Sequence, residues 1–283
     1  MTRQQPGPTI RRWQLGQELR ELREAASITP KAAADELEIG TSALSKIEGG
    51  KQTIKGTYVK LLAPLYGVDR EKREHLLALA EAANEPEWFA TYSKWVPDWF
   101  RQYLGYESSA SEIRTYESEL VPGLLQTADY AKAVALANRP DATNADITRT
   151  LELRRGRQQH MAEPDAVKLH AIVNEAVIRR AVGGPEVMRE QLAYLDQVSR
   201  GSHVVLQVLP FSAGAHPAMT APFTLLGFAE YPRMNTVYLE SGRGALYLEK
   251  PADLDRYDWM FSQLTEAALS PTDSRKFLGS VAW

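Results

Sequence analysis

The 283-residue chain contains no cysteine, which excludes disulfides, thiolate zinc sites and cysteine nucleophiles together. It also lacks any apolar run long enough to cross a bilayer. Its first residues, M-T-R-Q-Q-P-G-P, lack the apolar segment of a secretory signal peptide. These absences predict a cytoplasmic protein with no membrane contact.

Fingerprints of common catalytic sites are missing as well: the chain has no HExxH, P-loop, GxSxG or GxGxxG sequence. Its five histidines are scattered, at His75, His160, His170, His203 and His216. His216 follows Ser212 by four residues in a loop that contains glycine, a spacing that arises often by chance. We therefore predict no catalytic residue, no metal site and no cofactor, and we expect that the protein is not an enzyme.

Length and charge indicate two domains of different character. A hydrophobic content of 44% supports real cores, and 283 residues suit two domains. The net charge is −3, but residues 1–60 hold 10 Lys and Arg against 7 Asp and Glu, whereas the rest holds 23 against 29. Because phosphate binding needs clustered cations, a nucleic-acid surface is expected in the N-terminal part alone.

The stretch from Ser27 to Ile54 has the pattern of two short helices joined by a tight turn. Thr29 is a good N-cap, and Pro30 suits a first helical position because no amide hydrogen is needed there. Ile39 and Gly40 form the turn, with Gly40 or Thr41 capping the next helix. Apolar residues three apart predict the buried side of this second helix, and two glycines end it: Leu44, Ile47, Gly49 and Gly50.

This pattern resembles the lambda-repressor-like (Xre-type) helix-turn-helix domain over residues 10–83. The positions at which that family places packing residues are Ala34, Leu37, Ile39, Leu44 and Ile47. The resemblance implies a five-helix DNA-binding domain over residues 1–83. The family usually has glycine where this chain has Glu38, because a positive φ is often required there, so a slightly different turn is expected. The alternative is a helical hairpin with no nucleic-acid role.

A helix of this kind reads DNA by placing its N-terminal side chains against base edges in the major groove. The predicted base-reading residues are Thr41, Ser42, Ser45 and Lys46. The predicted phosphate contacts are Thr29, Lys31, Lys51, Gln52, Thr53 and Lys55. In the family an arginine of the first helix often pairs with a carboxylate of the reading unit, which makes Arg23 and Glu48 a candidate pair. The alternative is two unpaired, solvated charges.

Residues 84–86, Asn-Glu-Pro, are the expected boundary, and residues 87–283 form the second predicted domain. Aromatic residues at helical spacing follow the boundary: Trp88, Tyr92, Trp95, Trp99 and Tyr103. Pro97 is expected to kink or split that helix. Such a stripe is typical of a core or of a seam between domains, and the alternative is the wall of a ligand pocket or a dimer seam.

The remaining pattern predicts an α+β domain with a mainly antiparallel sheet. The expected strands are residues 112–120, 167–173, 204–209, 223–228, 236–240 and 245–249. Amphipathic helices are expected between and after them, the longest near the end being residues 253–269. Residues 146–161 form a charged helix, in which Arg154, Arg155 and Arg157 are interpreted as a solvated face because no aromatic residue lies between them.

Three further motifs extend the resemblance: P-G-L-L-Q-T-A-D-Y-A, V-G-G-P-E-V-M-R-E-Q-L and V-L-P-F-S-A-G-A-H-P. They resemble the C-terminal domain of actinobacterial antitoxin-like regulators of the Scr/WhiJ type. The resemblance implies a DNA-binding regulator that is often associated with a small partner protein. The residues predicted to contact an effector or partner are Trp95, Trp99, Phe211, His216 and Met219. Ordinary loop packing is the alternative for the last three.

Two functions stay open at this point. One is a sequence-specific transcriptional regulator that binds double-stranded DNA as a homodimer, on a palindromic or repeated operator, and senses an effector. The other is an antitoxin-like module that sequesters a small partner protein, with DNA binding serving autoregulation. The residues do not separate the two.

Overall fold

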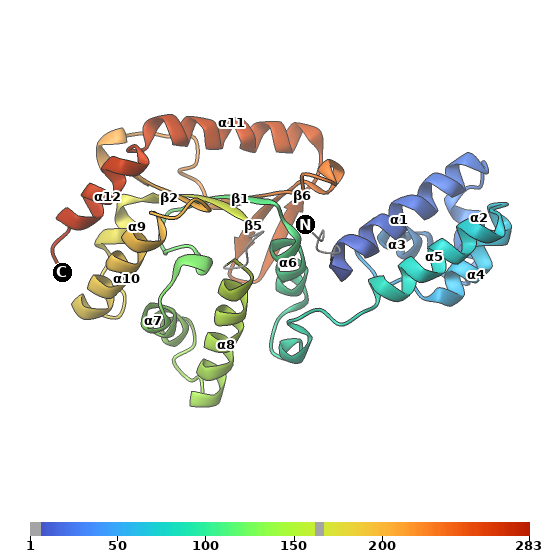
Figure 1. Cartoon of the computed structure of the whole chain (residues 1–283), viewed down its shortest axis with the longest axis horizontal. Coiled ribbons are helices and arrows are strands. Elements are labelled where there is room, and N and C mark those ends of the chain that lie inside the picture. Colours follow the sequence, from blue (N-terminus) through green and yellow to red (C-terminus); the bar gives the residue numbers. More distant parts are fainter. Residues whose placement is uncertain (1–6, 162–166) are drawn as a thin grey trace. The chain divides into compact units, whose positions relative to one another are not determined.

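The computed structural model describes residues 7–161 and 167–283 (Figure 1). Residues 1–6, which the first predicted domain includes, lie outside this range. The chain divides between Thr91 and Tyr92 into two compact units. None of the helices in the described residues has an apolar stretch long enough to cross a membrane.

The N-terminal unit is helical, as predicted. Its α-helices within residues 7–91 are α1 (Pro8–Ala25), α2 (Pro30–Glu36), α3 (Thr41–Glu48), α4 (Gly56–Leu65) and α5 (Arg70–Ala83). The expected stripe of α1 faces the core, with Leu15 and Leu19 fully buried and Leu22 packed beside them. The core also takes residues from every other helix of the unit, among them Ala33, Leu44, Leu62 and Leu76. One apolar side of each helix is therefore used within the unit itself.

Gly16 lets α1 approach α3 more closely than any other residue would allow. A Cβ atom at this position would lie 2.6 Å from the Ile47 carbonyl oxygen and 2.7 Å from that of Glu48. Both distances are shorter than real Cβ contacts, and both involve backbone atoms that cannot rotate away. The missing side chain thus fixes the position of α3 against α1.

The C-terminal unit is built on a six-stranded sheet with the order β3-β2-β1-β4-β5-β6. Its strands are β1 (Glu112–Glu117), β2 (Lys168–Asn174), β3 (Val204–Leu209), β4 (Phe223–Gly227), β5 (Thr236–Ser241) and β6 (Gly244–Leu248). The predicted strands are all present. The expectation of a mainly antiparallel sheet requires correction, because β1 pairs with β2, and β2 with β3, in parallel. The sheet is mixed: β4, β5 and β6 extend it by antiparallel pairs.

Helical crossovers explain the parallel half. Parallel neighbours cannot be joined by a tight hairpin and need a long connection, usually helical. Between β1 and β2 the chain forms η2 (Gly123–Leu125), α7 (Ala128–Asn138) and α8 (Asn144–Met161). Between β2 and β3 it forms α9 (Glu175–Arg179) and α10 (Pro185–Val198). β5 and β6, in contrast, are joined by a short turn and pair antiparallel.

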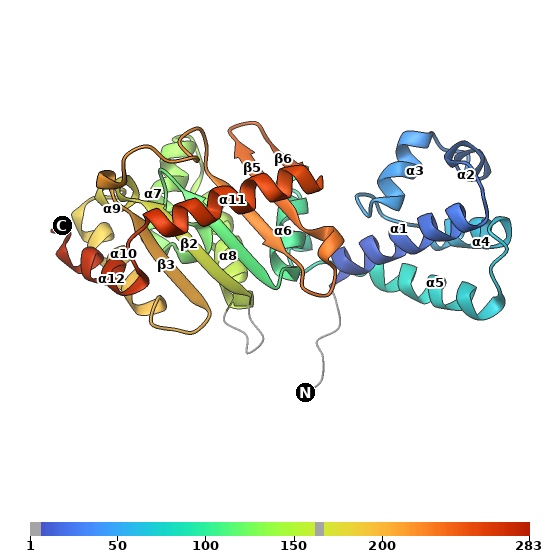
Figure 2. The same cartoon turned by 90° about the horizontal axis from the view of Figure 1, so that it is seen from above.

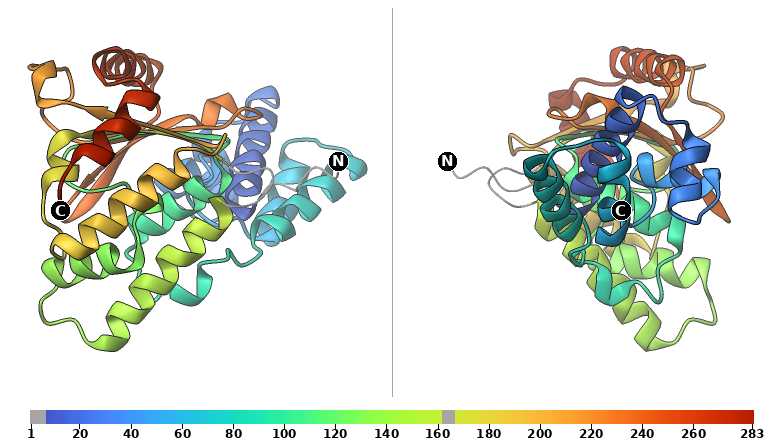
Figure 3. Two further views of the ribbon diagram at one scale, coloured as in Figure 1. Left: turned by 60° about the vertical axis from the view of Figure 1, so that its left-hand side comes forward. Right: turned by 90° about the vertical axis from the view of Figure 1, so that its right-hand side faces the viewer.

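Helices cover both faces of the sheet (Figures 1 and 2). Helix α11 (Pro251–Ala267) lies across one face, and its Phe261 and Leu264 pack on Tyr116 and Ile172 of the strands. Helices α6 (Asp98–Ser109) and α8 lie on the opposite face, as the turned views of Figure 3 also show. Helix α12 (Pro271–Ser280) packs beside β3. These two layers create two separate environments, which we call the α11 side and the α6/α8 side.

Candidate functional site

The predicted helix-turn-helix consists of α2 and α3. The Thr29 hydroxyl accepts a hydrogen bond from the Ala32 amide at 3.2 Å, so Thr29 is the N-cap and Pro30 the first helical residue, as predicted. Gly40, with extended backbone, occupies the N-cap position of α3. The structure thus decides between Gly40 and Thr41. Because Thr41 does not cap, its hydroxyl belongs to the first turn of the exposed helix.

Glu38 adopts the left-handed conformation, with φ of 54°, in which glycine is favoured. We expected Glu38 to alter the turn because it is not glycine, but its positive φ is the one that the family's turn requires. The reason is the way α2 ends: the Ile39 amide donates to the Ala34 carbonyl at 3.0 Å, and the Glu38 amide donates to Asp35 at 3.1 Å. This pair of hydrogen bonds requires a residue in the left-handed conformation between them, whichever side chain that residue has. Helix α3 ends in the same way, but with glycine, Gly50 (φ 67°).

Replacing Glu38 by glycine is expected to stabilise the N-terminal unit by roughly 0.5–1 kcal/mol, because the left-handed conformation costs a residue with a Cβ atom about that much. Urea unfolding followed by circular dichroism measures the change. Glu36→Gly is the matched control, since Glu36 is also exposed but lies in helical conformation, where glycine destabilises. Changes of the same sign in both variants would contradict this account of the turn.

Helix α3 has one buried and one exposed side. Leu44 and Ile47 point into the core, with 1% and 0% of their surface exposed. The predicted base-reading residues all lie on the exposed side of this helix: Thr41, Ser42, Ser45 and Lys46. This side offers hydroxyl groups and one ammonium group, which can donate hydrogen bonds to base edges, and the hydroxyls can also accept.

The predicted phosphate-binding residues are exposed as well, at Thr29, Lys31, Lys51, Gln52, Thr53 and Lys55. Thr29 and Lys31 lie at the start of α2, whereas the other four lie in the segment between α3 and α4. The Thr29 oxygen accepts the capping bond, so its hydrogen is still available as a donor. The Lys51 amide closes α3 through a 2.8 Å bond to the Lys46 carbonyl, which fixes the backbone from which its side chain extends.

A buried ion pair holds α3 to α1. The Arg23 guanidinium donates from Nε to Glu48 Oε1 at 2.6 Å and from Nη2 to Oε2 at 3.0 Å. The side chains of Arg23 and Glu48 are only 7% and 9% exposed. A third bond joins Arg23 to the Ile28 carbonyl at 3.0 Å. The hydrogen bond that Arg23 donates to Glu48 raises the pKa of Arg23, despite the opposing effect of burial. The pair suggested by the family resemblance is therefore confirmed.

The five predicted effector or partner residues are not brought together. Trp95 and Trp99 lie on the α6/α8 side, where the Trp95 ring meets the Arg149 guanidinium at 4.4 Å and the Trp99 carbonyl accepts from the Tyr247 hydroxyl at 2.5 Å. Pro97 separates the two, and α6 begins directly after it at Asp98. Before Pro97 the aromatic stretch forms only the short 3-10 helix η1 (Ala90–Tyr92), so the expected helix is present after Pro97 alone.

Phe211, His216 and Met219 lie on the α11 side, in the segment between β3 and β4. Phe211 and Met219 are 59% and 69% exposed. His216 packs edge-on against the Tyr116 ring, and its Nε2 lies 3.4 Å from the Tyr116 hydroxyl. Burial lowers the pKa of His216, so the neutral imidazole is favoured at neutral pH.

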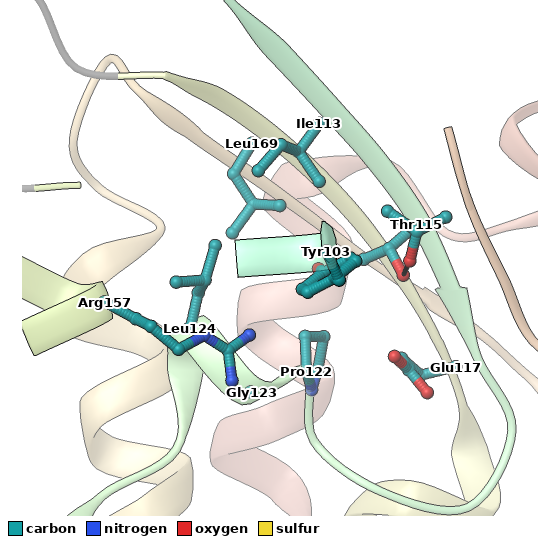
Figure 4. Close-up of a pocket in the computed structure, with 10 residues that line it drawn as sticks. Tyr103, Ile113, Thr115, Glu117, Pro122, Gly123, Leu124, Arg157 and Leu169 are labelled. Atoms are coloured by element: carbon teal, nitrogen blue, oxygen red, sulfur yellow. Dashed lines mark hydrogen bonds between the residues drawn. The ribbon is translucent and has the colours of Figure 1, made fainter. Parts of the chain in front are cut away.

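A pocket on the α6/α8 side was missed by sequence reasoning. Figure 4 shows the Glu117 carboxylate and the Arg157 guanidinium entering it from opposite sides, with Tyr103 and Pro122 between them. The space not filled by atoms, including the open mouth, is about 260 Å³. Burial and the nearby charge of Glu240 raise the pKa of Glu117 to about 8.

The arginines of α8 require a correction, because they do not form one solvated face. Arg157 is buried and holds Glu107 of α6 through two bonds of 2.7 Å. Arg154 turns to the same side and donates to the Gly123 carbonyl at 2.9 Å, whereas Arg155 is exposed. A spacing of three residues places Arg154 and Arg157 on one helix face. That spacing, together with an acidic residue, Glu107, in an aromatic helix, was the signal in the sequence for a buried ion pair.

Two family models match the chain. One is described as a helix-turn-helix domain and matches residues 14–76; the other is described as a domain of unknown function (DUF5753) and matches residues 100–280. No curated protein and no solved structure matches the chain. The first match confirms the predicted helix-turn-helix at the N-terminus, and the second lies within the C-terminal unit.

Proposed function

The chain belongs to the family defined by the domain of unknown function DUF5753, and we propose that this member is a sequence-specific transcriptional regulator, because its residues 14–76 match a helix-turn-helix domain. Its helix-turn-helix domain binds double-stranded DNA, and its C-terminal unit binds an effector or a small partner protein. We also propose that the N-terminal domain is of the Xre type and the C-terminal unit of the Scr/WhiJ type.

One observation carries the DNA-binding role: α3 exposes hydroxyl-bearing residues and a lysine while its apolar residues are buried. In a helical hairpin with no nucleic-acid role, the exposed helix does not have to be fixed rigidly to its neighbours. Here the helix is held by the close approach at Gly16 and by the buried Arg23–Glu48 pair. A rigid helix with short polar side chains suits base reading, because little conformational freedom is lost on binding.

We further propose a homodimer on a palindromic or repeated operator. A single domain of this size covers one half-site, and two-fold protein symmetry matches a two-fold operator. The C-terminal unit is the expected dimerisation region, because the N-terminal unit uses its apolar helix faces in its own core. We place the protein in the cytoplasm, where operator DNA is accessible. The proposal assigns it no catalytic activity.

Thr41→Ala and Ser45→Ala are each expected to weaken binding to a specific duplex by roughly 1–3 kcal/mol, because a base contact is lost. The duplex is first selected by the full-length protein from a randomised library. Fluorescence anisotropy then gives the Kd of each variant on the selected duplex and on a scrambled one. The loss is expected on the selected duplex alone.

Ser280→Ala provides the control for hydroxyl removal as such, because the exposed Ser280 hydroxyl donates only to the Phe277 carbonyl of its own helix. Lys55→Ala provides a second comparison: it is expected to weaken binding to both duplexes alike and to reduce the salt dependence by about one counterion. Unchanged affinity of both Thr41→Ala and Ser45→Ala for the selected duplex would refute the assignment of α3 as the reading helix.

The exposed apolar side chains of Phe211 and Met219 favour a second candidate function. Exposed apolar side chains that gather into one contiguous patch mark protein interaction sites. In this alternative the protein is an antitoxin-like module that sequesters a small partner protein. Co-purification of a small protein that is lost in Phe211→Ser, together with DNA binding that changes when the partner is added, would favour it. Unchanged co-purification in that variant would speak against it.

A further inference from the structure

The pocket on the α6/α8 side contains a carboxyl group, that of Glu117, for which the described residues provide no cationic partner. Its lining residues are Tyr103, Ile113, Thr115, Glu117, Pro122, Gly123, Leu124, Arg157, Leu169 and Thr224. Arg157 is already engaged by Glu107, and Arg154 donates to a backbone carbonyl. Within residues 7–161 and 167–283, no ion pair includes Glu117. Figure 4 shows its carboxylate directed into the pocket.

The sheet register places a second carboxylate beside it. Thr115 of β1 pairs with Thr224 of β4, which pairs with Tyr238 of β5, so these three residues form a row on one face. Glu117 and Glu240 each lie two residues further along strands that run in the same direction, and hence on that same face. One strand separates them. Glu240 accepts from the Tyr238 hydroxyl at 2.7 Å and is exposed, so it lies toward solvent.

Aromatic rings complete the surroundings. Tyr103 lines the pocket, and its ring centre lies 4.3 Å from that of Tyr238. The ring of Tyr247 follows at 5.3 Å from Tyr238. Ring faces attract cations, and the Tyr103 ring already meets one, the Arg157 guanidinium at 5.7 Å. The hydroxyls of Thr115 and Thr224 lie 3.0 Å apart, and their remaining lone pairs add acceptors. Ile113, Leu124 and Leu169 give the inner wall an apolar surface that suits an alkyl group.

These features select a cation among possible ligands. An anion would face two carboxylates, while both nearby guanidinium groups already have partners. A bound metal ion is disfavoured because the described residues contain no group of three or more acidic, histidine or cysteine side chains that could hold one. We propose that the C-terminal unit binds a small ligand with a protonated amino group, paired with Glu117 inside the pocket and with Glu240 at its mouth.

An amine ligand would be the effector in the function proposed above. The amine site itself does not depend on that function; only its effect on DNA binding does. The ammonium group supplies the cationic partner that Glu117 lacks, in addition to the Thr115 hydroxyl with which it already forms a hydrogen bond, and the alkyl part lies against the apolar wall. Because 260 Å³ includes the open mouth, the enclosed part of the ligand is limited to a few heavy atoms. A larger ligand would extend into solvent past Glu240.

Binding is tested on the full-length protein with ethylammonium as probe and ethanol as its neutral counterpart, by saturation-transfer NMR with titration. Saturable binding is expected for ethylammonium and none for ethanol at equal concentration. At pH 9, where Glu117 is mostly ionised, Glu117→Gln is expected to weaken the affinity at least tenfold. Glu112→Gln is the matched control, because Glu112 lies on the same strand but faces the α11 side, and it should leave the affinity unchanged.

The pH dependence gives an independent readout. With a pKa of about 8, Glu117 is ionised to about one tenth at pH 7 and about nine tenths at pH 9, whereas an alkylamine stays mostly protonated over this range. The affinity for ethylammonium should therefore rise about tenfold, and the rise should vanish in Glu117→Gln. The charged and titratable groups around Glu117 are Glu240 and Tyr238 of β5, Tyr103 and Glu107 of α6, Tyr116 of β1, Tyr130 of α7, and Arg154 and Arg157 of α8. Arg157 keeps its charge between pH 7 and 9, and Arg154, with a pKa of about 10, keeps most of its charge.

Glu117→Gln is expected to fold, since glutamine has the shape of the protonated side chain that prevails at neutral pH; circular dichroism checks this. Absence of saturable ethylammonium binding, or binding that survives Glu117→Gln, would overturn the assignment while leaving DNA binding intact. Conversely, saturable binding that needs Glu117 but leaves the affinity for the selected duplex unchanged would support the amine site and remove only its role as an effector site.

Discussion

Replacing Arg23 by methionine is expected to destabilise the N-terminal unit by roughly 3–5 kcal/mol, the usual cost of leaving a buried charge without its partner. Glu48 would lose both bonds to the guanidinium, and the Ile28 carbonyl would lose its donor. Since this pair joins α1 to α3, the loss should reach the reading helix. Native-state hydrogen exchange of amides in α1 and α3 measures the change in this unit alone, and affinity for the selected duplex should fall with it.

Arg20→Met is the matched control on the same helix. Arg20 pairs with Glu24 at 2.8 Å, but both side chains are more than half exposed, so its removal should change stability by less than about 1 kcal/mol. The double variant Arg23→Met with Glu48→Met should recover much of the loss, because it leaves no buried charge unpaired. Equal effects of Arg20→Met and Arg23→Met would mean that the buried pair does not fix α3.

The helix-turn-helix could be predicted in detail because local chemistry determines it. The Thr29 cap, the Pro30 start, the glycine end of α3 and the inward residues Leu44 and Ile47 all depend on neighbours within one or two turns. Glu38 marks the limit of that reasoning. Its side chain argues against a positive φ, yet the two hydrogen bonds that end α2 require one, and the bonds prevail at a cost of about 1 kcal/mol.

The strands of the C-terminal unit were predictable, but their pairing was not. Residue alternation and apolar runs mark a strand locally, whereas its neighbour is chosen by contacts distant in sequence. β1 pairs with β4 across more than 100 residues, with Thr115 beside Thr224. The helices expected between β1, β2 and β3 were a usable signal for parallel pairs, since such pairs need crossovers. Giving weight to the length of these connections would have predicted the mixed sheet.

The pocket escaped prediction for a different reason. Its charged residues come from separate elements, namely Glu107 on α6, Glu117 on β1, Arg157 on α8 and Glu240 on β5. In sequence, a charged residue on a helix most often indicates a solvated face. Only the packing of α8 against α6 reveals that Arg157 is buried and Arg155 is not. The predicted effector residues, in contrast, came from an aromatic stripe and from a loop of small residues, and the structure divides them between two sides of the sheet.

Arg157→Met is expected to destabilise the C-terminal unit by roughly 3–5 kcal/mol, as for any buried pair that loses one member. Glu107 would stay buried without its two 2.7 Å bonds, and the rings of Phe100 and Tyr103 would lose a cation at 5.5 and 5.7 Å from their centres. Because Arg157 is the link between α6 and α8 that lines the pocket, ethylammonium binding should be lost as well. Differential scanning calorimetry and exchange of amides in α6 and α8 measure the effect.

Arg155→Met is the control for the loss of one positive charge and for the change in helix propensity. Arg155 is two residues away on the exposed side of α8, so this substitution should change stability by less than about 1 kcal/mol. Arg157→Lys keeps the charge but cannot form two parallel bonds to Glu107, so an intermediate loss is expected. A graded order, with Arg155→Met mildest and Arg157→Met most severe, follows only if the fork geometry itself stabilises the packing of α8 on α6. An Arg157→Lys variant as stable as wild type would show that charge alone is enough, and that the two-bond geometry adds nothing.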